Sequence, residues 1–91
     1  MPTLVIKGKI TKGYDHWLEA FDDAEELRNS KYGIKCIYRG HEIDDTDTIH
    51  VVMYTPSMEA LMEHMENDRE LIDKAGGDPN PAANKMVICS D

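Results

Sequence analysis

Two histidines, His41 and His50, stand on either side of an acidic segment that contains Asp44, Asp45 and Asp47. Imidazole nitrogens can bind a metal, hydrogen-bond to a small organic molecule or transfer protons near neutral pH. A metal site needs at least a third ligand, and the spacing of this stretch supplies none, so we expect no metal. Two interpretations stay open: the histidines are a polar pair without a function, or they hydrogen-bond to a small organic ligand.

The segments that flank the aspartates predict a β-hairpin. Both are rich in β-branched and aromatic residues, and aspartate favours turns because its carboxylate bonds nearby backbone N–H groups. If Asp44 pairs with Asp47, then His41 lies directly across from His50. The same face then carries Ile37, Arg39, Thr48, Val52 and Tyr54, and the other carries Cys36, Tyr38, Gly40, Glu42, Ile49, Val51 and Met53. The second set is the more apolar, so we assign it to the side covered by helices; a shift of one residue would exchange the faces.

The hairpin fits into a longer alternation of strands and helices. We expect strands at residues 3–10, 34–43, 48–55 and 85–90, helices at 14–30 and from Pro56 onward, and a short extra helix at about 67–75. The first helix carries Trp17 and Phe21 on an apolar stripe with Asp15 as its N-cap, and Thr55 caps the second helix. This order predicts a single ferredoxin-like α+β domain over residues 1–91. Its mainly antiparallel sheet has helices on one face, with the first and third strands in the centre.

The composition argues against several classes of protein. The formal net charge is -8, from 18 acidic against 10 basic residues, which disfavours binding to nucleic acids and to anionic membranes. No apolar run is long enough to cross a bilayer, and the N-terminus does not resemble a signal peptide. Cys36 and Cys89 stand far apart in apolar segments, without the spacing of a zinc site. We expect a cytoplasmic protein whose cysteines are reduced core residues.

The sheet face that the helices leave bare is where we expect the function. With the predicted register it gathers Arg39, His41, His50 and Tyr54 beside apolar side chains, and these four are the ligand-binding candidates. Such a face is too apolar to remain in water, and a chain of 91 residues buries only about two-thirds of its unfolded surface. We therefore expect a homodimer in which two copies enclose a pocket for a small molecule.

The whole pattern resembles the dimeric α/β-barrel superfamily. The resemblance is carried by HWLEAFD in the first helix, Gly33-Ile34 before the second strand, the acidic turn before IHVVMY, and TPSMEALMEHM in the second helix. The superfamily includes antibiotic-biosynthesis monooxygenases, stress-responsive barrel proteins and many small uncharacterised bacterial proteins, and this chain is most similar to the last group. The resemblance implies a homodimer whose two sheets face each other, with a pocket between sheet and helices or in the barrel lining. It implies no particular reaction.

Two classes of function remain open. The first is a non-catalytic or regulatory dimer that binds a small ligand. The second is a cofactor-independent monooxygenase or isomerase that acts on a small aromatic or conjugated molecule. In that case Arg39 holds an anionic group, Tyr54 donates a hydrogen bond, and either His41 or His50 is the general base. Neither class needs a cofactor. His64, on the second helix, is expected at the surface.

Overall fold

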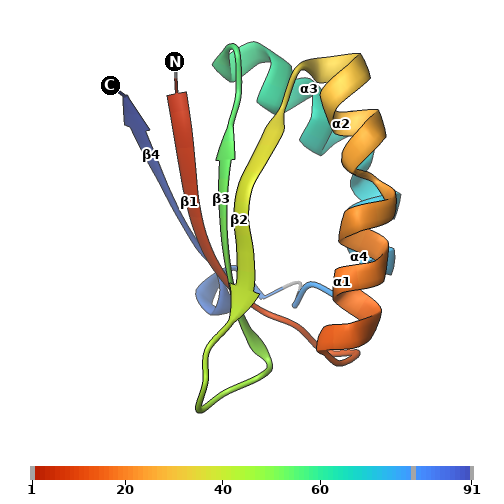
Figure 1. Cartoon of the computed structure of the whole chain (residues 1–91), viewed down its shortest axis with the longest axis vertical. Coiled ribbons are helices and arrows are strands. Elements are labelled where there is room, and N and C mark those ends of the chain that lie inside the picture. Colours follow the sequence, from red (N-terminus) through yellow and green to blue (C-terminus); the bar gives the residue numbers. More distant parts are fainter. Residues whose placement is uncertain (1, 79, 91) are drawn as a thin grey trace.

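The computed structural model describes residues 2–78 and 80–90, which form a four-stranded sheet with the α-helices on one side of it (Figure 1). The strands are β1 (Pro2–Lys9), β2 (Lys35–His41), β3 (Thr48–Tyr54) and β4 (Lys85–Ser90). The helices are α1 (Tyr14–Asp23), α2 (Glu25–Tyr32), α3 (Met58–Asn67) and α4 (Arg69–Lys74), and a 3-10 helix spans Pro81–Ala83. The predicted ferredoxin-like α+β fold is confirmed.

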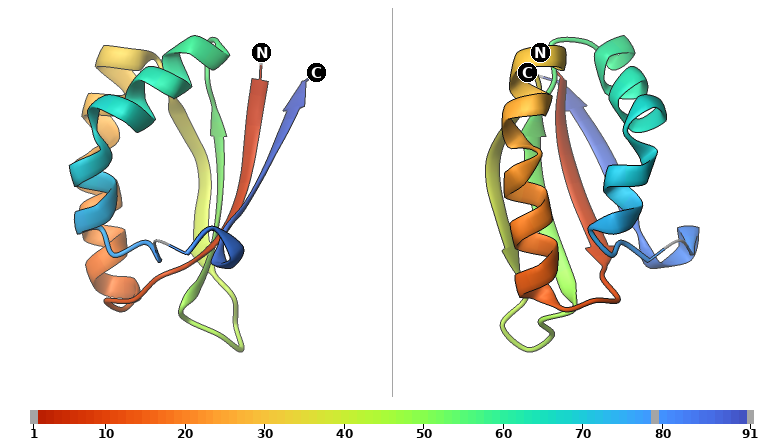
Figure 2. Two further views of the ribbon diagram at one scale, coloured as in Figure 1. Left: turned by 180° about the vertical axis from the view of Figure 1, so that it is seen from behind. Right: turned by 90° about the vertical axis from the view of Figure 1, so that its right-hand side faces the viewer.

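The strand order is β2-β3-β1-β4, and every neighbouring pair is antiparallel. As predicted, β1 and β3 are central and β2 and β4 are the edges, because each helical connection crosses one strand before the chain rejoins the sheet. Figure 2 shows the α-helices together on one face, and among the described residues no α-helix or further strand covers the opposite face of the sheet. The sheet of a single chain is open and does not close into a barrel.

The predicted helix over residues 14–30 is two helices, divided at Ala24 (φ -87°, ψ -2°). Arg28 bridges the division: its guanidinium donates to the carbonyl oxygen of Phe21 at 2.8 Å and lies 4.0 Å from the centre of that ring. Only 4% of Arg28 is exposed, and this burial lowers the pKa of its guanidinium. Gly33 ends α2 in the left-handed conformation (φ 70°), which glycine adopts without steric cost.

Two predicted helix caps are wrong. Asp15 lies inside the first turn of α1, near the positive pole of the helix, and Gly13 precedes the helix without any side-chain cap. Ser57, not Thr55, caps α3, because its Oγ accepts from the N–H of Ala60 at 3.1 Å. The buried Thr55 donates from its hydroxyl to the Ser57 carbonyl at 2.7 Å and so shapes the turn before the helix.

The hydrophobic core fills the layer between the helices and the sheet. Its buried members are Leu4, Ile10, Trp17, Tyr32, Ile34, Ile49, Val51, Met53, Leu61 and Ala75. Trp17 stacks on Phe21 with 4.9 Å between the ring centres, which confirms the predicted apolar stripe. Burying one large apolar side chain fully contributes about 1.5–3 kcal/mol to the stability of the fold. Met58 and Met62 of α3 lie outside this core and are exposed.

His64 is buried between α2 and α3, whereas the sequence pattern places it at the surface. Its Nδ1 donates to the Asp68 carboxylate at 3.0 Å, and its ring lies 5.2 Å from that of Tyr32. Asn67 donates to the Tyr32 hydroxyl at 3.4 Å. Burial raises the pKa of Asp68, but hydrogen bonds from Tyr32 and His64, aided by Lys31, outweigh it and hold the pKa below its ordinary value. This cluster ties the two helices together.

Replacing Asp68 by Asn should lower the free energy of unfolding by about 1–2 kcal/mol at neutral pH, because the charged acceptor of the cluster is lost. Since folding lowers the pKa of Asp68, its stabilisation is present above the unfolded carboxyl pKa of about 4 and disappears as the pH falls through the folded value. Urea denaturation of both proteins, from neutral pH to about pH 3, should show a difference that shrinks on acidification.

Asp73→Asn is the matched control for this experiment. Asp73 is an exposed carboxylate on α4 that pairs with Arg69 at 3.7 Å. Its replacement should change the free energy of unfolding by less than about 0.5 kcal/mol. Equal losses in the two variants, or a loss in the Asp68 variant that does not depend on pH, would contradict this description of the cluster.

Candidate functional site

The loop between β2 and β3 determines which side chains share a face of the sheet. The N–H of Glu42 donates to the Thr48 carbonyl at 2.9 Å, so residues 43–47 form the connection instead of a tight turn. Asp45 shapes this loop by accepting from a backbone N–H at 3.1 Å and from the Thr48 hydroxyl at 2.6 Å. Lys9 also pairs with this carboxylate, and its hydrogen bond is the largest of the influences that lower the pKa of Asp45 to about 2.

The predicted pairing of His41 with His50 is wrong, because the longer loop shifts the strands by one residue. His41 lies across from Ile49. A β-bulge at Ile37 shifts the register by a second residue nearer the start of β2, so Cys36 lies on the helix side, as predicted. The faces of residues 38–42 are therefore exchanged relative to the prediction, while the two faces of β3 are as predicted.

Arg39 and His41 consequently face the helices. Arg39 donates through Nε and Nη2 to the two carboxylate oxygens of Asp22 at 2.6 and 2.7 Å, and this pairing lowers the pKa of Asp22. The ring edge of His41 meets the Tyr14 ring with 4.5 Å between the centres, and its Nδ1 donates to the Glu42 carbonyl at 2.8 Å. These contacts hold β2 to α1 and separate both residues from His50 and Tyr54.

The surface that we call the open face is the sheet face opposite the helices. Directly opposed residues of antiparallel strands share a face, so the register defines its members. They are Thr3, Val5, Lys7 and Lys9 of β1; Lys35, Tyr38 and Gly40 of β2; Thr48, His50, Val52 and Tyr54 of β3; and Lys85, Val87 and Cys89 of β4. Of the four predicted ligand-binding residues, His50 and Tyr54 lie on this face, and their role in binding stays a prediction.

Apolar side chains occupy the middle of the open face. Val5, Tyr38, Tyr54 and Val87 are each between 41% and 54% exposed. The sequence pattern predicts the helix side for Tyr38, but the shift set by the loop places it on the open face. Its hydroxyl lies over Gly40, where an added Cβ would come within 2.5 Å of it, so a larger residue at this position would displace the tyrosine ring. Cys89 is also exposed on this face, so its predicted place in the core is wrong.

A histidine–carboxylate pair lies beside this apolar area. His50 Nε2 is 2.6 Å from Glu42 Oε2, and the Lys7 ammonium is 3.6 Å from the same oxygen. The hydrogen bond from His50 is the main influence that lowers the pKa of Glu42, and Lys7 adds to it. A carboxylate that holds one imidazole nitrogen fixes the ring and can stabilise its protonated form. The sequence pattern missed Glu42, because the predicted register turned it toward the helices.

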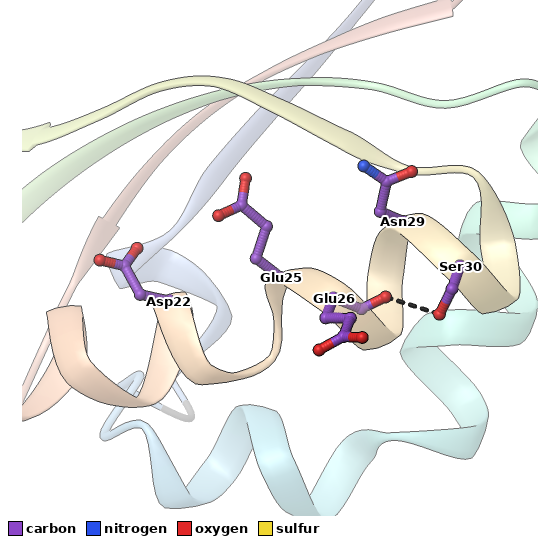
Figure 3. Close-up of a pocket in the computed structure, with 5 residues that line it drawn as sticks. All are labelled: Asp22, Glu25, Glu26, Asn29 and Ser30. Atoms are coloured by element: carbon purple, nitrogen blue, oxygen red, sulfur yellow. Dashed lines mark hydrogen bonds between the residues drawn. The ribbon is translucent and has the colours of Figure 1, made fainter.

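Two hollows on the helix layer have no connection with the open face. One of about 400 Å³ is lined by Asp22, Glu25, Glu26, Asn29 and Ser30, and the other of about 480 Å³ lies along the junction of α3 and α4. Figure 3 shows the first, where Ser30 donates to the Glu26 carbonyl at 2.7 Å. Its carboxylates converge on no buried polar group, and Asp22 is already engaged by Arg39. We assign neither hollow a function.

Within residues 2–78 and 80–90, no three His, Cys, Asp or Glu side chains are grouped so that they could hold a metal ion. Within the same residues, no helix combines the length and the apolar character that crossing a membrane requires.

Solved structures with the same fold cover nearly the whole chain. A protein of Nitrosomonas europaea assigned as an antibiotic biosynthesis monooxygenase superposes with a TM-score of 0.73 at 14% identity, over 100% of this chain and 98% of the other. A mutant form of SnoaB, a cofactor-independent oxygenase from Streptomyces nogalater, gives 0.69 at 8% identity, over 99% and 91%. A conserved protein from Methanosarcina mazei gives 0.69 at 14%, over 99% and 91%. At these identities the similarity establishes the fold, which confirms the resemblance seen in the sequence.

The family comparison is more specific to this chain. No curated protein matches the sequence. One family model does, described as a domain of unknown function (DUF3764), and its match covers residues 1–83. The strands, the four α-helices and the loop that sets the register of the open face all fall inside this match, apart from β4. The chain therefore belongs to the DUF3764 family.

Proposed function

We propose that two copies of this chain pack their open faces together and bind a small molecule in the space between them. The observation that carries this proposal is the half-exposed apolar group of Val5, Tyr38, Tyr54 and Val87, on a sheet whose other face is already covered. Contiguous apolar surface of this kind is unfavourable in water and marks an interaction site. The resemblance to the dimeric α/β-barrel superfamily supports the same conclusion.

A second copy suits this face better than an unrelated partner. The open face carries charges of both signs beside its apolar area, as in Lys7 and Glu42, so it can be complementary to itself across a two-fold axis. A small domain also gains stability from the extra burial that dimerisation supplies. The two sheets would then form the two walls of one barrel.

Polar groups beside the apolar area favour a ligand between the two sheets. Once the faces meet, the Tyr54 hydroxyl and the atoms of His50 and Glu42 that their mutual hydrogen bond leaves free need partners, because an unsatisfied polar group in such an interface costs free energy. A small molecule with both apolar and polar parts satisfies these groups and fills the space that they hold open. His50 and Tyr54 remain ligand-binding candidates on this basis, whereas Arg39 and His41 are engaged on the other side of the sheet.

Replacing Val5 by Asp should convert the dimer to a monomer. The substitution puts a charge at the centre of the apolar area of the open face, where Val5 lies between Val52 and Val87. Sedimentation equilibrium at micromolar concentration should give twice the chain mass for the unmodified protein and the single chain mass for the variant.

Ile43→Asp is the control for Val5→Asp. Ile43 is 94% exposed in the loop after β2, so the same change of charge should leave the dimer intact. The proposal fails if the unmodified chain sediments as a monomer. It also fails if Val5→Asp remains a dimer of unchanged affinity, because the dimer would then use another surface.

The contact between His50 and Glu42 favours a second candidate function, a cofactor-independent oxygenase or isomerase. At 2.6 Å the carboxylate can stabilise an imidazolium, so His50 could remove a proton from the hydroxyl of a conjugated phenol. Tyr54, on the same strand and face, could hydrogen-bond to the resulting anion. The chemistry would need no bound cofactor, because an electron-rich phenolate can react with oxygen directly.

Oxygen consumption with 1,4-dihydroxynaphthalene as the probe tests this second candidate. The rate should fall about 100-fold or more in His50→Ala, which removes the proposed base. His41→Ala should retain most of the activity, because His41 faces the helices. Equal rates in the unmodified protein and in His50→Ala would exclude His50 as the base.

A further inference from the structure

Three basic side chains form a row across the open face. Lys7 of β1 lies between His50 of β3 and Lys85 of β4 in the two registers, so all three project from neighbouring positions on the same side of the sheet. The fourth position of the row is Gly40, which has no side chain. We call His50, Lys7 and Lys85 the basic row.

Negative charge does not balance this row. The open face carries the lysines Lys7, Lys9, Lys35 and Lys85, in a chain whose formal net charge is -8. Two carboxylates reach it: Asp45 pairs with Lys9, and Glu42 is shared between His50 and Lys7. In the part of the chain that the structure describes, no carboxylate forms an ion pair with Lys85.

The unbalanced positive charge of the basic row becomes more costly in free energy if the open faces meet. Like charges directly across neighbouring strands destabilise a sheet even in water. Enclosing Lys7 and Lys85 between two sheets adds the cost of removing their ammonium groups from water. The second copy does not supply the missing negative charge, because a two-fold axis doubles the number of lysines along with the number of carboxylates. A bound anion would provide the missing charge.

The row beside the basic row has the opposite character. Tyr38, Val52, Val5 and Val87 lie across the four strands at the next position on the same face. A ligand that spans both rows would have an apolar, flat part against the tyrosine and valines and an anionic group against the lysines. We propose that the ligand of the open face is an aromatic anion, such as an aromatic sulfonate, carboxylate or phenolate, held by Lys7, Lys85 and His50. This inference rests on the function proposed above.

Two fluorescent probes that differ by one anionic group test this inference. 8-Anilinonaphthalene-1-sulfonate carries a sulfonate that N-phenyl-1-naphthylamine lacks, so the pair separates the contribution of the anion from that of the apolar pocket. The double variant Lys7→Gln, Lys85→Gln should bind the sulfonate about ten-fold or more weakly, the loss expected from removing charge-assisted contacts. Its affinity for the uncharged probe should stay within about two-fold of the unmodified protein's.

A double variant with the same change of net charge provides the control. Lys12→Gln with Lys74→Gln removes two exposed lysines from outside the sheet, so its affinity for both probes should be unchanged. Circular dichroism and sedimentation should confirm that each variant is folded and dimeric. Lys85→Gln alone provides a milder substitution if the double variant fails this check, and it should weaken sulfonate binding while sparing the uncharged probe.

The possible results distinguish this inference from the proposed function. If the unmodified dimer binds neither probe, the pocket itself is refuted and the inference falls with it. If it binds both probes but the Lys7 and Lys85 variants lose no more sulfonate affinity than the control, the pocket stands and the aromatic-anion inference is overturned. A selective loss of sulfonate affinity in the Lys7 and Lys85 variants supports the inference. A fall in the sulfonate affinity of the unmodified protein when salt is added supports it further.

Discussion

The register between β2 and β3 is the constraint on which the rest of this structure depends. It is fixed by the hydrogen bond from the Glu42 N–H to the Thr48 carbonyl and by the loop that Asp45 organises. Because side chains alternate between faces, a single residue of displacement decides whether a group reaches the helices or the open face. The same register sends Arg39 to Asp22 on α1 and leaves Glu42 beside His50.

With this register, the two faces of the sheet make different kinds of contact. Toward the helices, the core residues supply most of the hydrophobic stabilisation, and polar contacts such as Arg39 with Asp22 and His64 with Asp68 orient the helices. Toward the outside, the sheet leaves apolar side chains and a set of lysines without a covering layer. A dimer that encloses an aromatic anion would satisfy both kinds of group at once, because each supplies what the other lacks.

Much of the fold is encoded by local patterns that can be read from the sequence. Alternating strand residues, the stripe of Trp17 and Phe21, and Gly33 after α2 predicted the order and type of the main elements. Both faces of β3 were also predictable, because Ile49, Val51 and Met53 are uniformly apolar. Helix ends were less so: Ser57 and Thr55 have similar capping ability, and tertiary contacts choose between them.

The candidate site was predictable only in part. The turn residues DDTD suit both a tight turn and the longer loop, and in the observed loop Asp45 also pairs with Lys9 of a distant strand. Arg39, for its part, pairs with Asp22 of α1. Neither partner is close in sequence, so Arg39, His41 and Tyr38 were assigned to the wrong faces, and the burial of His64 by Tyr32 was missed for the same reason.

The central claim is that the open face becomes the contact between two copies. Cys89 lies on that face and Cys36 on the opposite side of the sheet, so the chain contains its own reporter and its own reference. The direct measurement is the rate of alkylation of each cysteine by iodoacetamide, followed by peptide mass spectrometry across a range of protein concentrations. We predict that the Cys89 rate falls as the dimer forms and recovers on dilution, while the Cys36 rate is unchanged. A Cys89 rate that does not depend on concentration, in a protein that sedimentation shows to dimerise, would contradict the claim.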